Sequence, residues 1–150
     1  MFGLNMVVNK GKTIFIADTS VHEYPTSEEM AEIAISAARV VRLFGIDPKI
    51  AFVSHSTFGQ PLTSRTKHIR SAVDILKDKQ VNFEFDGDMQ PDVALNPDYE
   101  ELYPFAKIVG KANILIMPGQ HSAAISYKLM KTIGDTKVIG PLLIGLGLPI

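Results

Sequence analysis

The fold is decided by residues 13–53, which read TIFIADTSVHEYPTSEEMAEIAISAARVVRLFGIDPKIAFV. The first five residues of this stretch are rich in β-branched and aromatic side chains, which is typical of a short buried strand. Residues 26–44 then carry apolar side chains at helical spacing, and residues 50–53 form a second apolar run. A strand, a helix and another strand in this order predict a βαβ unit with two parallel strands.

The predicted helix over residues 26–44 has clear signals at both of its ends. Thr26 at the N-cap and Glu29 three residues later form a capping box, in which each side chain accepts a hydrogen bond from a free backbone N–H. Gly45 stands where a helix often ends in a left-handed residue, and Pro48 prevents the helix from continuing. This is the best-defined helix in the sequence.

The alternation of strands and helices continues to the end of the chain. Residues 112–117, ANILIM, are an apolar run of the kind found inside parallel sheets. The pattern predicts a three-layer α/β/α sandwich with a mostly parallel sheet. In order, the remaining expected elements are a helix from Thr63 or Ser64, a strand over 81–85 ended by an Asp86-Gly87 turn, short helical turns only over 88–103, a strand over 112–117, a helix capped by Ser122 and running to about 133, and a strand over 137–139.

Composition limits the classes of protein to which the chain can belong. Its 150 residues, 46% of them hydrophobic, suffice for a single domain over 1–150 with a sizeable core. Fifteen basic against sixteen acidic residues leave a net charge of -1, so we expect neither a nucleic-acid nor a membrane partner. The absence of cysteine excludes a disulfide framework, a thiolate zinc site and a cysteine nucleophile. With no signal peptide and no apolar stretch of membrane-spanning length, we expect a cytoplasmic protein.

The last thirteen residues, 138–150, contain no charged side chain. The C-termini of whole proteins are usually polar, and an apolar run that simply stops predicts either a fragment of a longer chain or an end covered by a partner. A buried last strand is the alternative. We favour the fragment.

Two loops that follow predicted strands carry candidate binding residues. In open α/β sheets ligands bind beyond the carboxyl ends of the strands, and helix N-termini there favour anions. The candidates for an anion or coenzyme A site are Ser54, Ser56, Thr57 and Gly59 in the first loop, Gln120 in the second loop, and Tyr127 and Lys128 on the helix that follows. If the two loops face each other, they form a cleft with two anion-friendly walls. On the residues alone, a hydroxyl-rich turn beside a solvated basic helix is somewhat favoured over a site.

Other chemistry finds little support in the sequence. The four histidines lack the spacing of a metal site, and residues 86–92 depart from a calcium loop. No G-x-S-x-G elbow is present, and the glycines near the C-terminus do not open a helix as a dinucleotide fingerprint would. We therefore expect no catalytic residue and no bound metal or cofactor in this chain.

Several long motifs resemble the phosphate acetyl/butyryl transferase family, in the same order as in that family. The resemblance extends from about residue 13 to residue 149, and the chain is most similar to the phosphotransacetylase-like domain at the C-terminus of bacterial NADP-dependent malic enzymes. The motifs are the run over 16–59 that begins IADTSVHEYP, DGDMQPDVALNP at 86–97, KANILIMPG at 111–119, AISYKL at 124–129 and IGPLLIGLGLP at 139–149.

Two departures from the stand-alone transferases support the malic-enzyme branch. Phe58 stands where those enzymes carry the lysine of a serine-threonine-lysine-glycine-serine motif, and Thr132 stands where they carry an arginine. The family's catalytic serine–arginine motif and aspartate follow the pair Leu148-Pro149, so they lie outside this chain. The resemblance therefore implies a chain without acyltransferase activity of its own.

The resemblance also implies a fold, partners and cofactors. The fold would be the second, inserted subdomain of the phosphotransacetylase (isocitrate/isopropylmalate dehydrogenase-like) architecture, with a coenzyme A cleft against a companion subdomain. The parent would be an NADP-dependent enzyme that decarboxylates malate to pyruvate with Mg²⁺ or Mn²⁺. This part would sense acetyl-CoA and support a homo-oligomer, in contact with the companion subdomain and the malic-enzyme domain of the same chain.

Two other functions remain open from the sequence. One is a phosphate acetyl/butyryltransferase that acts on acyl-CoA and phosphate, and the other is a small-anion-binding module. The length of the natural reading frame distinguishes an oxidoreductase parent from a transferase parent. The malic enzymes extend several hundred residues further toward the N-terminus.

Overall fold

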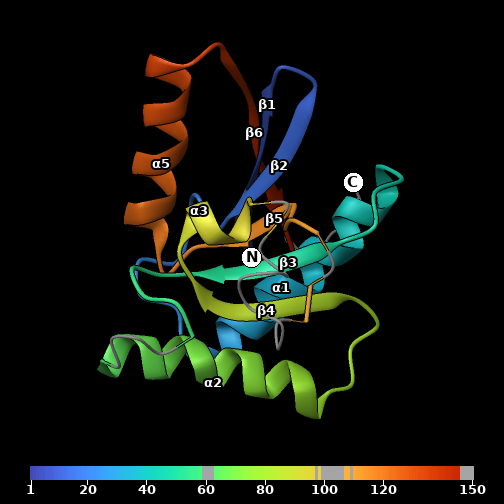
Figure 1. Cartoon of the computed structure of the whole chain (residues 1–150), viewed down its shortest axis with the longest axis vertical. Coiled ribbons are helices and arrows are strands. Elements are labelled where there is room, and N and C mark those ends of the chain that lie inside the picture. Colours follow the sequence, from blue (N-terminus) through green and yellow to red (C-terminus); the bar gives the residue numbers. More distant parts are fainter. Residues whose placement is uncertain (59–62, 97, 99–106, 109, 146–150) are drawn as a thin grey trace.

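The chain folds around one six-stranded sheet with the strand order β4-β3-β5-β2-β1-β6 (Figure 1). The computed structural model describes residues 1–58, 63–96, 98, 107–108 and 110–145. The strands are β1 Phe2–Asn9, β2 Lys12–Ala17, β3 Lys49–Val53, β4 Glu84–Met89, β5 Ile114–Ile116 and β6 Thr136–Ile144. The helices are α1 Ser27–Leu43, α2 Ser64–Asp78, α3 Pro91–Ala94 and α5 Gln120–Ile133.

Four neighbouring strands run parallel, and the other two add an antiparallel edge. β3 pairs in parallel with β4 and β5, and β5 pairs in parallel with β2. β1 is antiparallel to β2, and β6 is antiparallel to β1. Three of these five pairings are parallel, which confirms the predicted mostly parallel sheet.

Each face of the sheet has its own apolar core, as a three-layer sandwich requires. On one face, α1 and α2 cover Phe15 and Phe52, and both of these rings are fully buried. On the other face, α3 and α5 cover Ile16 and Met89. Successive residues such as Phe15 and Ile16 point to opposite faces because side chains alternate along a strand. The predicted α/β fold class is confirmed.

The predicted ends of α1 and the predicted start of α2 are confirmed by the structure. The Thr26 hydroxyl accepts the Glu29 N–H at 3.0 Å, and the Glu29 carboxylate accepts the Thr26 N–H at 3.0 Å. Gly45 follows α1 with φ of +75°, a conformation that glycine adopts without strain. Thr63 caps α2 in the same way, through the Thr66 N–H.

The first strand, β1, was not predicted from the sequence. Asn5 and Asn9 interrupt its apolar residues, so the alternation that marks a strand is weak. The turn at Lys10 and Gly11, with φ of +49° and +78°, joins β1 to β2 as a tight hairpin. β1 reaches its place in the sheet through pairing with β2 and β6, which a local pattern does not reveal.

Three predicted boundaries were wrong. Asp86 and Gly87 do not form a turn but lie inside β4, where they pair with Ala51 and Phe52 of β3. Helix α5 begins at Gln120 with Gly119 as its N-cap, and the Ser122 hydroxyl lies one turn inside, donating to the Gly119 carbonyl at 3.0 Å. The last strand is nine residues long rather than three, because it pairs along β1.

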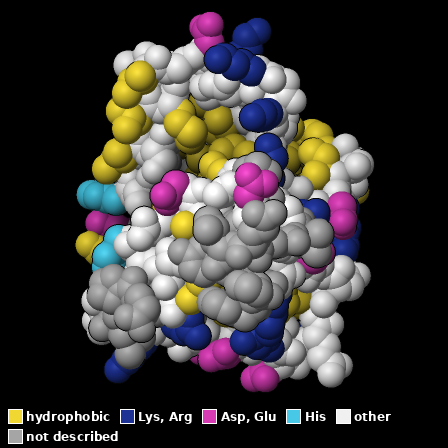
Figure 2. Space-filling view, viewed as in Figure 1, with side chains coloured by type: hydrophobic (Ala, Val, Ile, Leu, Met, Phe, Trp, Pro, Cys, Tyr) yellow, Lys and Arg dark blue, Asp and Glu magenta, His cyan; other side chains and the backbone are white. Residues whose placement is uncertain are grey.

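Helix α5 and strand β6 are the least covered elements of the described chain. Figure 2 shows hydrophobic side chains on the surface over α5 and between α5 and the β1–β2 hairpin. None of the described helices is both long and apolar enough to cross a membrane.

Candidate functional site

The carboxyl ends of β2, β3, β4 and β5 meet at one edge of the sheet because these strands run parallel. Asp18 directly follows β2 and Ser54 directly follows β3, whereas Pro118 and Gly119 lie two and three positions after the end of β5. Asp88 is the penultimate residue of β4. Ligands of open α/β sheets bind beyond this edge, so these residues frame the candidate site.

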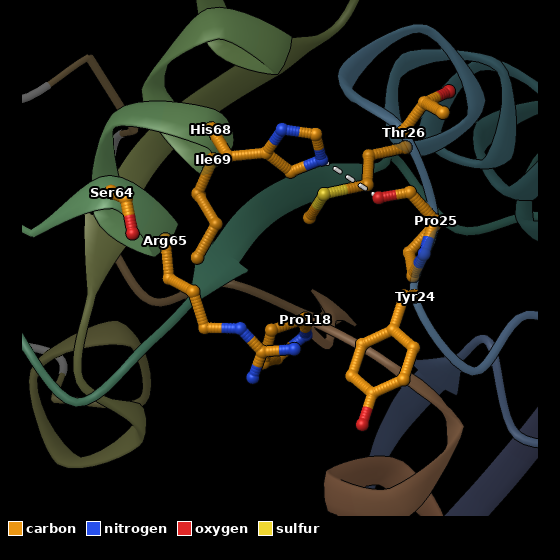
Figure 3. Close-up of a pocket in the computed structure, with 9 residues that line it drawn as sticks. Tyr24, Pro25, Thr26, Ser64, Arg65, His68, Ile69 and Pro118 are labelled. Atoms are coloured by element: carbon orange, nitrogen blue, oxygen red, sulfur yellow. Dashed lines mark hydrogen bonds between the residues drawn. The ribbon is translucent and has the colours of Figure 1, made fainter.

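A cavity of about 300 Å³ opens at this edge, and we call it the Tyr24 cavity (Figure 3). Its walls come from the segment before α1, the first turns of α2 and the start of the loop after β5. The residues that line it include Tyr24, Pro25, Met30, Arg65, His68 and Pro118. The adjoining hollow, about 200 Å³, is lined by Gly119, His121 and Ser122 together with Glu23.

This geometry corrects the predicted cleft. The loop over 118–122 does reach a cavity, but it faces Tyr24 and Arg65 rather than the loop that begins at Ser54. The reason lies in a close contact that only the fold creates. A side chain at Gly119 would overlap the Glu23 carbonyl oxygen, and the Gln120 N–H donates to the His22 carbonyl at 2.9 Å.

The Tyr24 cavity combines an apolar floor with a cation at its mouth. Met30 is buried in the floor, and the Arg65 guanidinium lies 5.2 Å from the centre of the Tyr24 ring. Within the described part of the chain, Arg65 has no carboxylate partner. A cation over an exposed aromatic ring beside an apolar pocket suits a ligand with both an anionic and a flat or apolar part.

Histidine 68 holds the wall of this cavity in place. Its Nε2 lies 2.8 Å from the Pro25 carbonyl oxygen, and a carbonyl only accepts, so Nε2 carries a proton. The Ser27 hydroxyl donates to the His68 carbonyl at 2.8 Å. These bonds join the N-terminus of α1 to α2 and fix the distance across the cavity.

A second network orders the segment that leads from β2 to Tyr24. The Asp18 carboxylate accepts the N–H groups of Gly3 and His22, both at 2.7 Å, and that of Ser20 at 3.0 Å. Burial raises the pKa of Asp18, but these backbone hydrogen bonds and one from the His22 ring outweigh it and hold the pKa below its ordinary value.

The His22 ring bridges Asp18 and Glu29. Its Nδ1 lies 2.6 Å from the Asp18 carboxylate and its Nε2 lies 3.0 Å from that of Glu29. The pKa of Glu29 is lowered, first by the Thr26 backbone N–H and also by His22.

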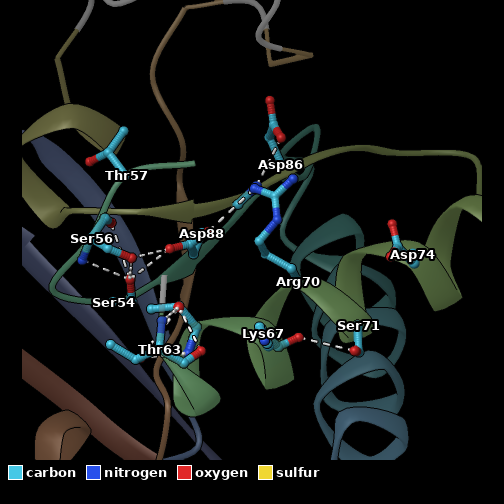
Figure 4. Close-up of polar contacts among 12 residues, drawn as sticks. Ser54, Ser56, Thr57, Thr63, Lys67, Arg70, Ser71, Asp74, Asp86 and Asp88 are labelled. Atoms are coloured by element: carbon cyan, nitrogen blue, oxygen red, sulfur yellow. Dashed lines mark hydrogen bonds and ion pairs between the residues drawn. The ribbon is translucent and has the colours of Figure 1, made fainter. Parts of the chain in front are cut away.

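The hydroxyls of Ser54 and Ser56 do not point to solvent but to a buried carboxylate (Figure 4). The Ser56 hydroxyl donates to Asp88 Oδ2, and the Ser54 hydroxyl lies 3.2 Å from the same oxygen. The two hydroxyl oxygens are 3.0 Å apart. Ser56 and Asp88 are fully buried, and Arg70 from α2 reaches Asp88 Oδ1 at 3.5 Å. We call Ser54, Ser56, Arg70 and Asp88 the Asp88 cluster.

The Asp88 cluster has a clear chemical consequence. Each serine hydroxyl has a single proton to donate, and the Asp88 carboxylate competes for both of them. An external anion that binds here therefore has to displace Asp88 from the hydroxyls. The carboxylate also partly neutralises the positive charge of Arg70.

The structure brings only some of the predicted site residues together. Thr57 follows the cluster and accepts the Gln90 N–H at 3.4 Å, whereas Gly59 lies outside the described residues. Gln120 begins α5 at the same edge. Tyr127 and Lys128 lie about 10–12 Å further along that helix, at 1.5 Å per residue. Tyr127 packs on the apolar core and Lys128 is exposed.

The sequence missed Asp88, Arg70, Asp18 and the pair of Tyr24 with Arg65. Asp and Gly are uncommon in strands, so the run that contains Asp88 indicated a turn. Arg70 and Arg65 were seen only as part of a basic helix face. Within the described residues, no three His, Cys, Asp or Glu side chains gather where they could hold a metal ion.

Comparison with known proteins places this geometry in a family. Residues 1–150 match the phosphate acetyl/butaryl transferase family. The NADP-dependent malic enzyme of Rhizobium meliloti is 47% identical over 97% of this chain, which spans 19% of that enzyme. The phosphate acetyltransferase of Bacillus subtilis is 33% identical over 96% of the chain, which spans 45% of that protein.

A solved structure shows the same fold. The phosphotransacetylase from Streptococcus pyogenes superposes with a TM-score of 0.87 at 30% identity, over 94% of this chain and 44% of the other. The chain thus spans about a fifth of the malic enzyme and less than half of the transferases. The sequence match over all 150 residues and the shared fold lead to one conclusion: the chain belongs to the phosphate acetyl/butaryl transferase family.

Proposed function

We propose that this chain is the phosphotransacetylase-like part of an NADP-dependent malic enzyme, that it binds acetyl-CoA as an effector, and that it does not catalyse acyl transfer. The observation that carries the proposal is the Asp88 cluster. A buried carboxylate occupies the serine hydroxyls that would otherwise be offered to an anion at this edge.

Acyl transfer to phosphate makes demands that these residues do not meet. The attacking phosphate must be held, and the developing oxyanion must be stabilised, both by positive groups or aligned donors. Phe58 and Thr132 stand where the sequence resemblance places a lysine and an arginine in the stand-alone enzymes. Arg70, the cation beside the two serines, is paired with Asp88. Loss of one well-placed electrostatic group lowers a rate on the order of a hundredfold or more.

Binding of acetyl-CoA makes different demands, and the Tyr24 cavity supports them. A coenzyme A thioester carries phosphates, a flat adenine ring and an uncharged acyl arm. The Arg65 guanidinium is available to phosphate, and the Tyr24 ring is 72% exposed, so it offers a stacking surface. A ligand that only binds does not need the serine hydroxyls of the Asp88 cluster.

The remaining functions of the parent belong to other parts of a longer chain. In this proposal, NADP and the Mg²⁺ or Mn²⁺ needed to decarboxylate malate bind to those other parts. In this proposal the chain contacts a companion subdomain and the malic-enzyme domain, works in the cytoplasm, and forms part of a homo-oligomer.

Calorimetric titration of the chain with acetyl-CoA, coenzyme A and inorganic phosphate tests the binding role. We expect acetyl-CoA to bind and to raise the thermal midpoint, because a ligand of the native state stabilises it by mass action. Arg65→Gln should weaken this binding on the order of tenfold or more. Arg39→Gln is the matched control, because Arg39 is an exposed cation on α1 away from the edge. Equal binding by the two variants would contradict the site.

The alternative function is that of a phosphate acetyl/butyryltransferase. The 33% identity with the Bacillus subtilis phosphate acetyltransferase favours it. A coupled assay for phosphate-dependent release of coenzyme A from acetyl-CoA separates the two. Turnover that scales with the concentration of repurified chain would replace our proposal with the transferase.

A further inference from the structure

Three side chains of the Asp88 cluster converge on the carboxylate of the fourth (Figure 4). The Ser56 hydroxyl donates to Asp88 Oδ2, and the Ser54 hydroxyl lies 3.2 Å from the same oxygen. Arg70 approaches the other oxygen, Oδ1, at 3.5 Å from α2. Hydroxyl groups and a guanidinium around one anion are the donors with which proteins bind external carboxylates and phosphates. Here the bound anion belongs to the chain itself.

The two serines are held in place by bonds that do not involve the carboxylate. The Ser54 N–H donates to the Met89 carbonyl at 3.0 Å, and the Ser56 N–H donates to the Ser54 hydroxyl oxygen at 2.9 Å. The Ser54 hydroxyl also lies 3.1 Å from the Ser56 carbonyl oxygen, which gives its proton a second acceptor. The donors therefore keep their positions when the Asp88 carboxylate is absent.

Arg70 connects this buried site to the surface. The Asp88 side chain is fully buried, whereas the Arg70 side chain is 44% exposed. Arg70 also lines a hollow of about 290 Å³ between α2 and β4. The other charged residues that line this hollow are Asp74, Lys77, Asp86 and Lys107. The distance of 3.5 Å from Arg70 to Asp88 exceeds that of a direct hydrogen bond, so the guanidinium can turn toward the hollow without breaking a tight contact.

We propose that Ser54, Ser56 and Arg70 form a binding site for a carboxylate-sized oxyanion, and that Asp88 occupies this site as a built-in ligand. The contact is autoinhibitory, because an external carboxylate binds only when the Asp88 carboxylate leaves. A ligand that is tethered beside its site competes at a high effective concentration. The site therefore stays closed to free anions in the natural chain.

This inference rests on the proposed function in one respect, because that function requires the two serines to be closed to external anions. The two nevertheless fail separately. Acetyl-CoA binding is measured on the natural chain and on Arg65→Gln. The oxyanion site is measured on variants of Asp88 in the absence of acetyl-CoA.

Rescue of Asp88 variants by small carboxylates tests the site. Asp88→Ala removes only the carboxylate group, so formate should fill the vacated space. Asp88→Gly removes the methylene group as well, so acetate should fit that variant better than formate. We expect the thermal midpoint of each variant to rise by about 3–5 °C as its matching anion reaches about ten times its dissociation constant, by mass action. The natural chain should show no such rise. Phosphate, which has more oxygen atoms than the vacated space accommodates, should stabilise either variant less than its matching carboxylate.

Three controls separate a bound anion from a general effect of salt. Asp88→Asn is the matched variant, because its amide fills the space of the carboxylate and leaves no room for formate. Sodium chloride at equal ionic strength corrects for the screening of charges. Arg70→Gln, added to Asp88→Ala, should weaken formate binding on the order of tenfold, because the guanidinium supplies the positive charge.

The test also covers a variant that does not fold in buffer. Such a variant is refolded in its matching anion and in chloride, and recovery of the native circular dichroism only in the matching carboxylate demonstrates binding. Equal effects of formate and chloride on Asp88→Ala, an equal response of Asp88→Asn to formate, or failure of both variants to respond to their matching anions would each overturn the proposal.

Discussion

Helices α1 and α5 lie on opposite faces of one sheet, yet they are buried to very different extents. Eight of the 17 residues of α1 are buried, and its N-cap is closed by a capping box. Only Ala123 is buried among the 14 residues of α5, and its N-cap makes no side-chain hydrogen bond. The contrast teaches that the described residues of this chain cover the inner stripe of α1 well, whereas they leave the outer side of α5 exposed.

The largest expected effect comes from emptying the core under α1. Phe15 is fully buried, and its ring centre lies 5.8 Å from that of Phe44. Phe15→Ala should lower the free energy of unfolding by about 3–5 kcal/mol, through lost burial and the cavity left behind. Leu129→Ala on α5 should cost less than about 1 kcal/mol in dilute solution. Urea titration measures both, and equal losses would remove the contrast between the helices.

A smaller loss is expected when the Asp88 cluster is broken. Asp88→Ala removes the carboxylate that accepts from the Ser56 hydroxyl and pairs with Arg70, while the Ser54 hydroxyl keeps the Ser56 carbonyl oxygen at 3.1 Å. We expect the free energy of unfolding to fall by about 2–4 kcal/mol. Asp74→Ala on α2 is the control, because Asp74 is 72% exposed and an exposed ion pair contributes little. A loss below about 1 kcal/mol for Asp88→Ala would show that solvent satisfies the hydroxyls.

The Asp18 network predicts a dependence of stability on pH. The pKa of Asp18 is lower in the folded chain than in the unfolded chain, so its contribution is present above about pH 4 and is lost as the pH falls through the folded value. At pH 7, Asp18→Asn should cost about 1–3 kcal/mol because its backbone donors lose their acceptor.

The difference between the natural chain and Asp18→Asn should shrink at acid pH. Asp135→Asn, in the exposed turn after α5, is the control and should change stability by less than about 0.5 kcal/mol. A difference between natural chain and Asp18→Asn that stays constant from pH 7 to pH 2 would contradict the role of the carboxylate.

The smallest effect concerns the helix caps. Thr26→Ala should cost about 1 kcal/mol, since the Glu29 N–H loses its partner. Thr132→Ala, inside the exposed part of α5, should change stability by less than about 0.5 kcal/mol. A serine at Gly119 is destabilising although serine is a good N-cap residue, because its side chain would overlap the Glu23 carbonyl. Thermal midpoints of the three variants measure these differences.

The predicted elements held where capping and apolar periodicity agreed, and failed where one turn pair or one cap residue was the only signal, as at Asp86-Gly87 and Ser122. Helix α1, the start of helix α2 and strand β3 were placed within two residues, because capping residues and apolar periodicity act over a few positions. Strand β1 and most of β6 were missed. Their residues pair across the whole chain, Asn9 with Thr136 for example, and their local patterns are interrupted by Asn5, Gly140 and Pro141.

The candidate site divides in the same way. The sequence predicted that polar residues follow β3 and β5 at the edge of the sheet where ligands bind in such folds, because parallel strands bring their carboxyl ends together. The sequence did not predict which groups those residues face. Ser54 and Asp88 are 34 positions apart, and only the pairing of β3 with β4 brings the carboxylate onto the hydroxyls.

The sequence by itself determined the α/β class, the covered stripe of α1 and the edge of the sheet at which the candidate site residues lie. The tertiary structure alone decided that Asp88 takes the serine hydroxyls, that Tyr24 and Arg65 share a cavity, and that α5 keeps an apolar side exposed. The physical reason is the distance along the chain over which each kind of interaction acts. Caps and periodicity are set by neighbours within one or two turns, whereas burial and hydrogen-bond partners depend on strands that meet only after the chain has folded.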